Sequence, residues 1–254
     1  MAAWPADVDR VVLESTDSTS AEAARRAPPG PTWILARRQT AARGRRGRAW
    51  SMPEGNFAAS LTWRPGGAPA MHALRSFTAS LALHDALSGM GVAGLTLKWP
   101  NDVLLEGGKL AGILLEGSGD RLILGIGINL VAAPGAAEVE PGAVRPVSLL
   151  EATGLRVTPE AMLDALAPAF AAREAELVTW GFAPIRRAWL HRAARLGEGV
   201  TARTMRETLQ GTFEDVDEDG QLVLRTAEGP RRIPAADIFF GPVPGEETEA
   251  ALCS

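Results

Sequence analysis

Residues 95–129 read LTLKWPNDVLLEGGKLAGILLEGSGDRLILGIGIN, and this stretch decides the fold. It contains four short apolar runs of strand length, most of them separated by glycine or acidic turns. The predicted strands are Leu95–Lys98, Val103–Leu105, Leu110–Leu115 and Leu122–Asn129. Strands that follow one another directly favour a mixed sheet over a regular alternation of strands and helices.

Further strands and helices are predicted on both sides of this stretch. Three more strands are predicted, at Val11–Leu13, Trp33–Ala36 and Phe57–Trp63. Four helices are predicted, at residues 21–27, 69–89, 159 to about 177, and from about residue 184. Residues 132–146, rich in Ala, Pro and Gly, are typical of an irregular connection. We therefore predict an α+β fold in which helices back a mixed β-sheet.

Beyond Gly197 the pattern changes to short strands with turns. Five strands are predicted there, at Gly199–Arg203, Thr208–Val216, Leu222–Arg225, Arg231–Pro234 and Ile238–Phe240. Such a pattern is typical of a small SH3-like β-barrel. We predict a main domain at residues 1–196, this β domain at 197–243 and a tail at 244–254.

The composition is that of a soluble globular protein. The 254 residues are 46% hydrophobic and 22% charged, and the formal net charge is −4, so no global charge attracts nucleic acid or an anionic membrane. The single cysteine, Cys253, cannot form an internal disulfide, which fits a reducing compartment. The sequence shows neither a secretory signal nor an apolar run long enough to cross a bilayer. We expect a soluble, cytoplasmic protein without membrane contact.

Residues 37–50, RRQTAARGRRGRAW, are the most unusual segment. Arginine occupies six of the twelve positions from 37 to 48 in a chain that is acidic as a whole. Planar, permanently charged donors on a glycine-containing loop suit carboxylate and phosphate groups. A nucleic-acid or localisation patch and a solvated basic loop remain alternatives for this composition.

Lys109 and Asp102 form a second candidate pair. Lys109 stands at the start of an apolar strand and can reach a phosphate or a developing negative charge. Asp102 can hold a magnesium ion together with water and substrate phosphates. The alternative is a plain hairpin with a turn at Glu106-Gly107-Gly108 and a solvated lysine.

Two other segments carry candidate binding groups. Gly125 and Gly127 alternate with isoleucine in a strand, which marks a place where a ligand or a backbone packs closely. The amide of Asn129, at the end of this strand, can contact a nucleotide. The alternative is a tightly packed core strand with a turn-forming asparagine. Thr19-x-x-Glu22 matches a helix capping box, although hydroxyls at a helix start can also bind a small polar ring.

The sequence offers no protein-built metal site. Asp215, Asp217, Asp219 and Gly220 resemble a calcium loop, but Thr226 replaces the required glutamate, so we predict a hairpin turn. Three histidines lie on predicted helices without metal-ligand companions, at His72, His84 and His191.

Taken in order, the segments resemble the biotin protein ligases. The matching motifs are the arginine loop at Ala42–Trp50, Lys98–Asp102, Gly107–Leu114 and Gly125–Asn129. Asp17-Ser18-Thr19 also matches, with Ser20 in place of the commoner asparagine, and the similarity extends from about residue 11 to 240. One departure is Ala42, where the family has a glycine; the methyl group would restrict the loop or crowd the biotin ring.

The resemblance implies a catalytic domain like that of class II aminoacyl-tRNA synthetases and a two-step reaction. Biotin would attack ATP to give biotinyl-5'-AMP, aided by Mg²⁺, and a lysine of a biotin carboxyl carrier protein would then take the biotin. The implied catalytic residues are Lys109, Arg43 and Asp102. The implied biotin contacts are Ser18, Thr19, Ser20, Gln39, Arg43, Gly44, Arg45, Lys109, Gly112, Leu114 and Gly125. The implied nucleotide contacts are Arg45, Arg46, Arg48, Trp50, Asn101, Lys109, Gly127 and Asn129.

Partners and competing functions follow from the same resemblance. The motifs begin at residue 18, which leaves no room for an N-terminal DNA-binding domain, so we expect no nucleic-acid binding. A homodimer is one option for the oligomeric state. Three other functions are alternatives to a biotin protein ligase: a lipoate or other acyl-group ligase, a nucleic-acid-binding module that uses the arginine loop, and a degenerate ligase that only senses biotin.

Overall fold

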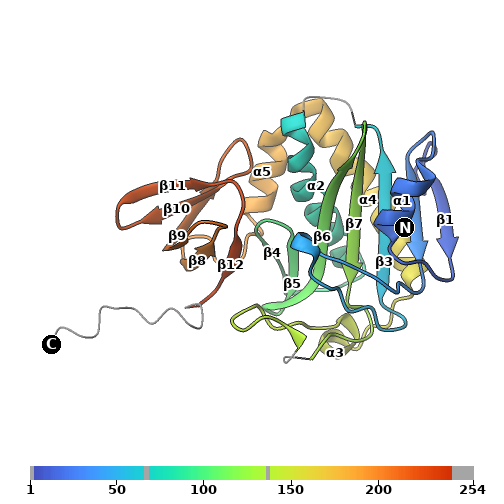
Figure 1. Ribbon diagram of the computed structural model, residues 1–254, viewed down its shortest axis with the longest axis horizontal. Coiled ribbons are helices and arrows are strands. Elements are labelled where there is room, and N and C mark those ends of the chain that lie inside the picture. The colour runs from blue at the N-terminus through green and yellow to red at the C-terminus, as the bar shows by residue number, and fades with distance from the viewer. Residues whose placement is uncertain (1–2, 66–68, 136–137, 242–254) are drawn as a thin grey trace.

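A seven-stranded sheet forms the centre of the molecule (Figure 1), whose computed structural model describes residues 3–65, 69–135 and 138–241. The strand order is β1-β2-β3-β7-β6-β5-β4; β1 pairs with β2 in parallel and the other neighbours pair antiparallel. The strands are β1 (Asp9–Leu13), β2 (Thr32–Ala36), β3 (Phe57–Trp63), β4 (Leu95–Lys98), β5 (Asp102–Leu105), β6 (Gly108–Ser118) and β7 (Arg121–Ile128). The predicted mixed sheet is confirmed.

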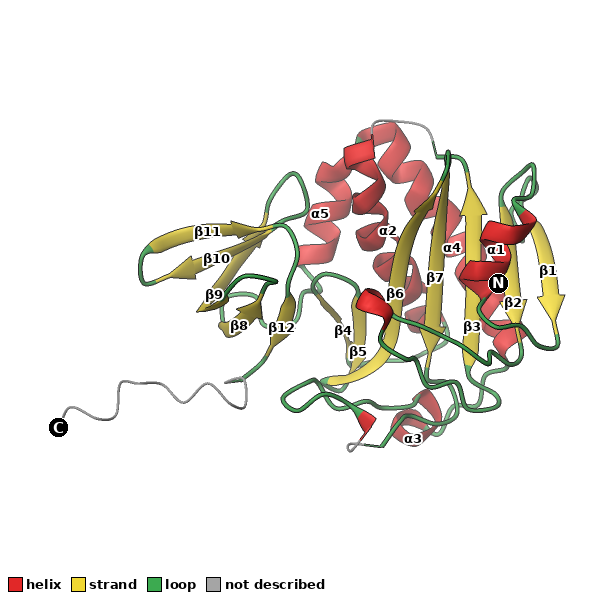
Figure 2. Ribbon diagram, viewed as in Figure 1, coloured by secondary structure: helices red, strands yellow, loops and turns green. Residues whose placement is uncertain are grey.

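Helices cover the two faces of this sheet unequally. On one face pack α2 (Pro69–Gly89) and α4 (Pro159–Trp180), and α5 (Phe182–Leu190) packs against both of them (Figure 2). The other face carries α1 (Thr19–Arg26), which contacts β2, β3 and β7 and leaves β5 and β6 without an α-helix; the short 3-10 helix η1 (Arg45–Gly47) belongs to the arginine-rich loop. This uncovered half of the sheet faces the arginine-rich loop.

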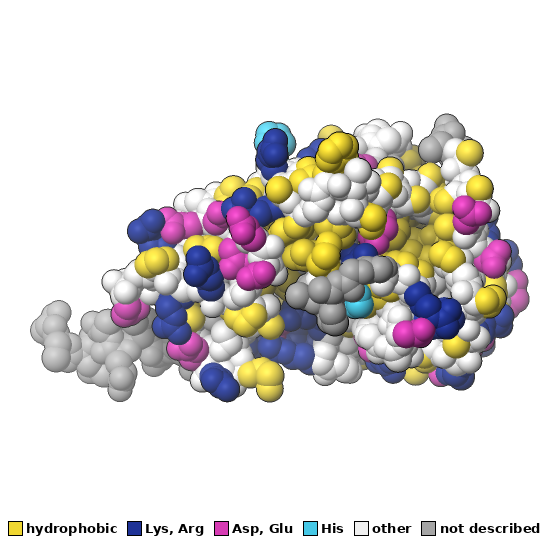
Figure 3. All heavy atoms as spheres, turned by 90° about the horizontal axis from the view of Figure 1, so that it is seen from above, with side chains coloured by type: hydrophobic (Ala, Val, Ile, Leu, Met, Phe, Trp, Pro, Cys, Tyr) yellow, Lys and Arg dark blue, Asp and Glu magenta, His cyan; other side chains and the backbone are white. Residues whose placement is uncertain are grey.

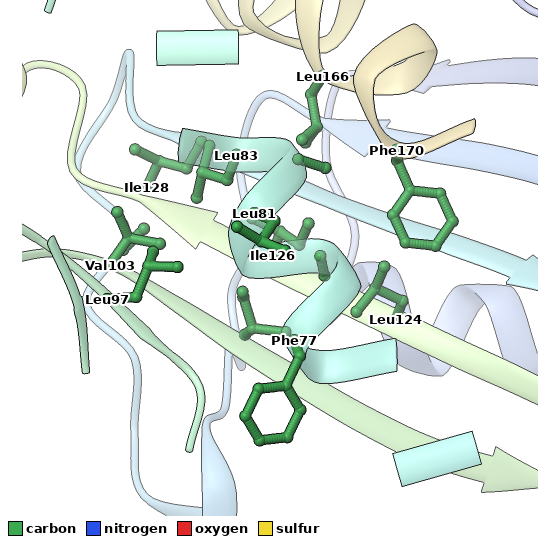
Figure 4. Packing of buried hydrophobic residues seen from close by; sticks show 14 of the residues in the cluster. Phe77, Leu81, Leu83, Leu97, Val103, Leu124, Ile126, Ile128, Leu166 and Phe170 are labelled. Atoms are coloured by element: carbon green, nitrogen blue, oxygen red, sulfur yellow. The ribbon is translucent and has the colours of Figure 1, made fainter. Parts of the chain in front are cut away.

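Alternation along β7 separates the core from the opposite face. Successive side chains of a strand point to opposite faces. Leu124, Ile126 and Ile128 point towards α2 and α4, where they join Phe77 and Phe170 in the buried cluster (Figure 4). Gly125 and Gly127 therefore face the other way. The glycines singled out in the sequence lie on the side of the sheet that the large helices do not cover.

A two-residue turn joins β5 to β6. Leu105 pairs with Gly108, so the loop consists of Glu106 and Gly107, with φ values of 48° and 75°. Two successive positive φ values are typical of the type I′ turn, whose twist matches that of the strands. The predicted hairpin is confirmed, but the three-residue turn is wrong because Gly108 already belongs to β6. Lys109 is therefore the second residue of the strand.

A second, five-stranded antiparallel sheet follows α5, in the order β11-β10-β9-β8-β12. Its strands are β8 (Gly199–Arg203), β9 (Thr208–Val216), β10 (Leu222–Thr226), β11 (Gly229–Ile233) and β12 (Asp237–Phe239). This sheet agrees with the predicted SH3-like module. The hairpin between β9 and β10 contacts the turn between β4 and β5, where the indole of Trp99 donates a hydrogen bond of 3.0 Å to the carbonyl of Gly220.

Smaller differences between prediction and structure have local causes. Helix α3 (Leu149–Thr153) was not predicted; it is a single short helix with Ser148 as its N-cap and Gly154 as its C-cap. Strand β11 begins at Gly229, two residues before the predicted Arg231, and ends at Ile233, one residue before the predicted Pro234. The predicted tail, residues 244–254 with Cys253, lies outside the described residues. Among the helices that the structure describes, none combines the length and the apolar character needed to span a bilayer.

Candidate functional site

A cavity of about 710 Å³ opens on the face of the main sheet opposite α2 and α4. Its walls come from the start of α1, the arginine loop, strands β5–β7, the 132–146 connection and β12 of the small sheet. It brings together these sequence-predicted site residues: Ser18, Thr19, Ser20, Gln39, Arg43, Gly44, Arg45, Arg48, Trp50, Asn101, Asp102, Lys109, Gly112, Leu114, Gly125, Gly127 and Asn129. Arg46 is the predicted residue that does not line it.

Glycines of β6 and β7 form part of the cavity floor. Gly112 and Gly127 pair across the two strands, and the indole of Trp50 lies directly on them. A Cβ atom on Gly127 would lie 2.7 Å from Trp50 Nε1, and one on Gly112 would lie 3.1 Å from Trp50 Cζ3. The indole nitrogen is buried and has no hydrogen-bond partner in the described protein. A side chain at either glycine would displace the tryptophan.

Hydroxyl groups gather at the α1 end of the cavity. Ser18 caps α1 by accepting a hydrogen bond from the Ala21 backbone, so Thr19 is the first helical residue and not the cap. The prediction of a Thr19 capping box is therefore wrong. Freed from capping, the Thr19 hydroxyl turns inward, 2.8 Å from the hydroxyl of Ser60 on β3. The Thr19 backbone N–H donates a hydrogen bond of 2.7 Å to Gln39 Oε1, which ties the two predicted biotin-contact segments together.

A carboxylate between two lysines stands at the other end of the sheet. Lys109 Nζ lies 2.8 Å from Asp102 Oδ1, and Lys98 Nζ lies 3.8 Å from Asp102 Oδ2. Lys98 was not among the predicted site residues. It pairs with Asp102 across the β4–β5 turn, only four residues further along the chain, so the spacing within the Lys98–Asp102 motif was a signal that could have found it. Burial lowers the pKa of the Lys98 ammonium, and the charge of Asp102 opposes that shift.

Carboxylates from two other segments hold the arginine loop. Asp237 of β12 accepts hydrogen bonds from Arg46 and Arg48, at 2.9 and 2.6 Å. Glu140 of the irregular connection lies 3.5 Å from Arg48 and also binds Arg203 of β8. Burial favours a raised pKa for Asp237, but the hydrogen bond from Arg48 and the neighbouring arginine charges outweigh it, so its pKa is lowered. The loop is thus anchored to the small sheet by ion pairs.

The backbone of the arginine loop accommodates alanine at position 42. Among the described residues, the non-glycine positions with positive φ are Ala27, Arg46, Glu106 and Arg195, so Ala42 needs no glycine-only conformation. Its carbonyl accepts a hydrogen bond of 3.0 Å from the Trp50 backbone, which closes the base of the loop.

The carboxylates around the cavity do not fit a metal site built by the protein. Both oxygens of Asp102 face lysine ammonium groups, and Asp237 and Glu140 face arginines. Within the described ranges, no group of three or more His, Cys, Asp or Glu side chains is arranged to hold a metal ion. The expectation that Asp102 binds magnesium therefore lacks support from this geometry.

Asn129 has a structural role as well as a free acceptor. Its amide nitrogen donates hydrogen bonds to the backbone carbonyls of Lys109 and Val147, which fixes the connection after β7 against β6. Its Oδ1 atom is buried in the cavity wall and has no partner in the described protein. Only this oxygen is available to a ligand.

Comparisons with known proteins agree with the geometry. Residues 11–131 match the model of the biotin/lipoate A/B protein ligase family, and residues 196–241 match that of the biotin protein ligase C-terminal domain. A biotin--[acetyl-CoA-carboxylase] ligase from Paracoccus denitrificans is 55% identical over 91% of this chain and all of that protein. The bifunctional ligase/repressor BirA of Bacillus subtilis is 33% identical over 91% of this chain and 72% of that protein.

A solved structure shows the same architecture. The biotin protein ligase from Aquifex aeolicus in complex with biotin and ATP superposes with a TM-score of 0.82 at 26% identity. The match covers 91% of this chain and 97% of the Aquifex chain. The two proteins thus share their architecture over almost the whole length of both chains. The chain belongs to the biotin protein ligase family.

Proposed function

We propose that this chain attaches biotin to a lysine of a biotin carboxyl carrier protein at the expense of ATP, through biotinyl-5'-AMP. The observation that carries the proposal is the cavity of about 710 Å³, with neutral hydroxyl and amide groups at one end and lysines and arginines at the other. Biotin has the same polarity, with a neutral ureido ring at one end and a carboxylate at the other. The solved relative that matches this chain was obtained with biotin and ATP together.

In the first step, a biotin carboxylate oxygen attacks the α-phosphorus of ATP and the bond to pyrophosphate breaks. Two anions must approach each other, so the residues mainly neutralise charge and align the reactants. Arg43 and Arg45 are proposed to hold the carboxylate and the phosphate, and Lys109 to bridge the two. Trp50 is proposed to pack on the adenine, with Arg48 on the phosphates.

In the second step, the ε-amine of the carrier lysine attacks the acyl carbon and AMP leaves. Asp102 is well suited to this step, since it is the carboxylate that lies beside the bridging lysine. Once Lys109 engages phosphate, Asp102 can take a proton from the incoming ammonium and orient the neutral amine towards the acyl carbon; the amide loses its second proton as AMP leaves. The arginine loop is proposed to exclude water from the anhydride.

Magnesium is proposed to arrive with the nucleotide rather than to occupy a protein site. Mg²⁺ prefers water and phosphate oxygens and needs few protein ligands. We further propose that the acceptor is the carrier of acetyl-CoA carboxylase, as the name of the Paracoccus relative suggests, and that the protein acts in the cytoplasm. We also propose that the main domain ends at residue 196 and that the β domain begins at residue 197.

Two rivals are less well supported. The family model of the main domain covers lipoate ligases too, but the match to the C-terminal domain of biotin protein ligases favours biotin. A nucleic-acid-binding module would need a free basic surface. Three arginines, Arg46, Arg48 and Arg203, are instead paired with acidic side chains, and basic and acidic groups are interspersed on the face shown in Figure 3.

Exchange of labelled pyrophosphate into ATP tests the proposal. We expect exchange with biotin, none with lipoate, and a loss of about 100-fold or more in Lys109→Ala, because one charge-stabilising group contributes on that scale. Biotin binding without exchange would support the rival function of a degenerate ligase that only senses biotin. Salt-dependent nucleic-acid binding without exchange would support the nucleic-acid module.

A further inference from the structure

A serine beneath the hydroxyl end of the cavity has no role in the proposed reaction so far. Ser60 lies in the middle of β3 with its residue fully buried. Its hydroxyl oxygen is 2.8 Å from that of Thr19 and 3.0 Å from that of Ser20. Ser60 itself does not line the cavity, whereas Thr19 and Ser20 do. It therefore reaches a ligand only through its two neighbours.

The sheet register creates this hydroxyl cluster. Ser60 pairs with Gly125 of β7, so both residues face α1. A Cβ atom on Gly125 would lie 2.7 Å from the Ser20 hydroxyl and 3.5 Å from the Ser60 hydroxyl. The missing side chain at Gly125 leaves the space in which the hydroxyls of Thr19, Ser20 and Ser60 meet.

The hydrogen-bond count of the cluster restricts what Thr19 can do. A hydroxyl has one hydrogen and two lone pairs. Ser60 can donate that hydrogen to Thr19 or to Ser20, but not to both. Gln39 Oε1 accepts the Thr19 backbone N–H, which uses one of its two lone pairs, while the Gln39 amide nitrogen can donate to a ligand. A hydroxyl whose own hydrogen is directed elsewhere presents only acceptor lone pairs to a ligand N–H.

A cyclic urea needs both hydrogen-bond donors and hydrogen-bond acceptors from the protein. Its carbonyl oxygen accepts hydrogen bonds and each of its two nitrogens donates one. When Thr19 donates its hydrogen to Ser60 and Ser60 donates to Ser20, the lone pairs of Thr19 are free for a ligand N–H. We propose that Ser60 is a positioning residue that makes Thr19 a hydrogen-bond acceptor for the ureido ring of biotin. This inference rests on the proposed function.

Thr62 provides a matched control on the same strand. It lies two residues after Ser60 on the same face of β3 and is equally buried. Its hydroxyl has no hydrogen-bond partner in the described protein. Thr62→Val thus removes a buried hydroxyl that directs nothing, while Ser60→Ala removes the one that orients Thr19.

The test measures biotin-dependent pyrophosphate exchange and separates KM from kcat. For Ser60→Ala we expect the KM for biotin to rise about five- to tenfold, the value of one hydrogen bond. The kcat and the KM for ATP should change less than about twofold on the same scale. Thr62→Val should leave the KM for biotin at the wild-type value.

Desthiobiotin, which keeps the ureido ring but lacks the sulfur, completes the test. Ser60→Ala should weaken desthiobiotin and biotin by the same factor. An unchanged KM for biotin, an equal loss in kcat and both KM values, or a loss confined to biotin would overturn the assignment. Absence of exchange in the wild-type protein would instead refute the proposed ligase function, so the two failures are distinguishable.

Discussion

Replacement of Asp102 by asparagine keeps the shape of the side chain and removes the charge that holds two lysines. Asp102 is buried, and the Lys98 side chain is only 11% exposed. At an effective dielectric constant of about 20, the attraction is about 6 kcal/mol at the Lys109 distance and about 4 kcal/mol at the Lys98 distance. Desolvation of the charges offsets much of this gross attraction.

The expected decrease in the free energy of unfolding depends on the lysine charges that Asp102→Asn leaves unpaired. Removal of one partner from a buried ion pair costs about 3–5 kcal/mol. Lys109 is 30% exposed and recovers some hydration, so we expect Asp102→Asn to lower the free energy of unfolding by about 2–4 kcal/mol. Denaturant titration at neutral pH measures this difference.

The pH dependence gives a second readout with a definite sign. Burial already lowers the pKa of Lys98, and loss of the Asp102 charge removes the interaction that opposes this shift. Above the lowered folded-state pKa and up to the ordinary lysine value, the unfolded chain binds more protons than the folded one. Stability therefore rises with pH in this window, and it should rise more steeply in the variant.

Two further variants separate the effect of an unpaired buried lysine from the effect of removing any carboxylate. Lys98→Met combined with Asp102→Asn removes the buried cation as well and should recover most of the stability while activity stays low. Asp120→Asn breaks an exposed ion pair with Arg64 and should cost less than about 1 kcal/mol. Wild-type stability of Asp102→Asn, with an unchanged pH profile, would refute the reasoning.

Gly127→Ala places a methyl group 2.7 Å from Trp50 Nε1, so we expect displacement of the indole and a rise of tenfold or more in the KM for ATP, on the scale of a lost stacking contact of about 1.4 kcal/mol or more. Gly117→Ala, whose added Cβ meets no atom within 4 Å, is its control, and equal kinetics in both variants would contradict the role of the floor. Asp237→Asn removes the carboxylate that binds Arg46 and Arg48. We expect trypsin to cut the loop of the ligand-free variant faster than that of the wild type, and the free energy of unfolding to fall by about 1 kcal/mol. Because the Asp237 pKa is lowered, this contribution is present above the ordinary carboxylate pKa and fades as the pH falls through its lowered folded-state value; a variant cut no faster than wild type would argue against the anchor.

Local patterns predicted most of the fold. Strands β3, β4, β8 and β9 begin and end at the predicted residues, because each is an apolar or alternating run with a clear turn on both sides. The register of these strands was beyond the sequence. The turn at Glu106-Gly107 and the cap at Ser18 were each misplaced by one residue, since neighbouring glycines or hydroxyls offered equivalent local solutions.

Site residues that belong to short sequence motifs were predicted. Most of those that were missed depend on contacts with distant segments. Lys109 and Asp102 were named from motifs, and they meet as expected of one site. Ser60 and Asp237 were not named, because their partners Thr19 and Arg48 lie in distant segments and give no local signal. Lys98 belongs to a quoted motif but was given no site role, although its partner Asp102 is only four residues away.

The central claim is tested most directly by transfer of labelled biotin to a biotin carboxyl carrier domain. The account predicts a covalently labelled carrier only when ATP and biotin are both present, with AMP and pyrophosphate formed in equal amounts. A carrier whose acceptor lysine is replaced by arginine should stay unlabelled, and Lys109→Ala should lose labelling. Absence of labelling of the intact carrier by the wild-type protein, or labelling without ATP, would contradict the account.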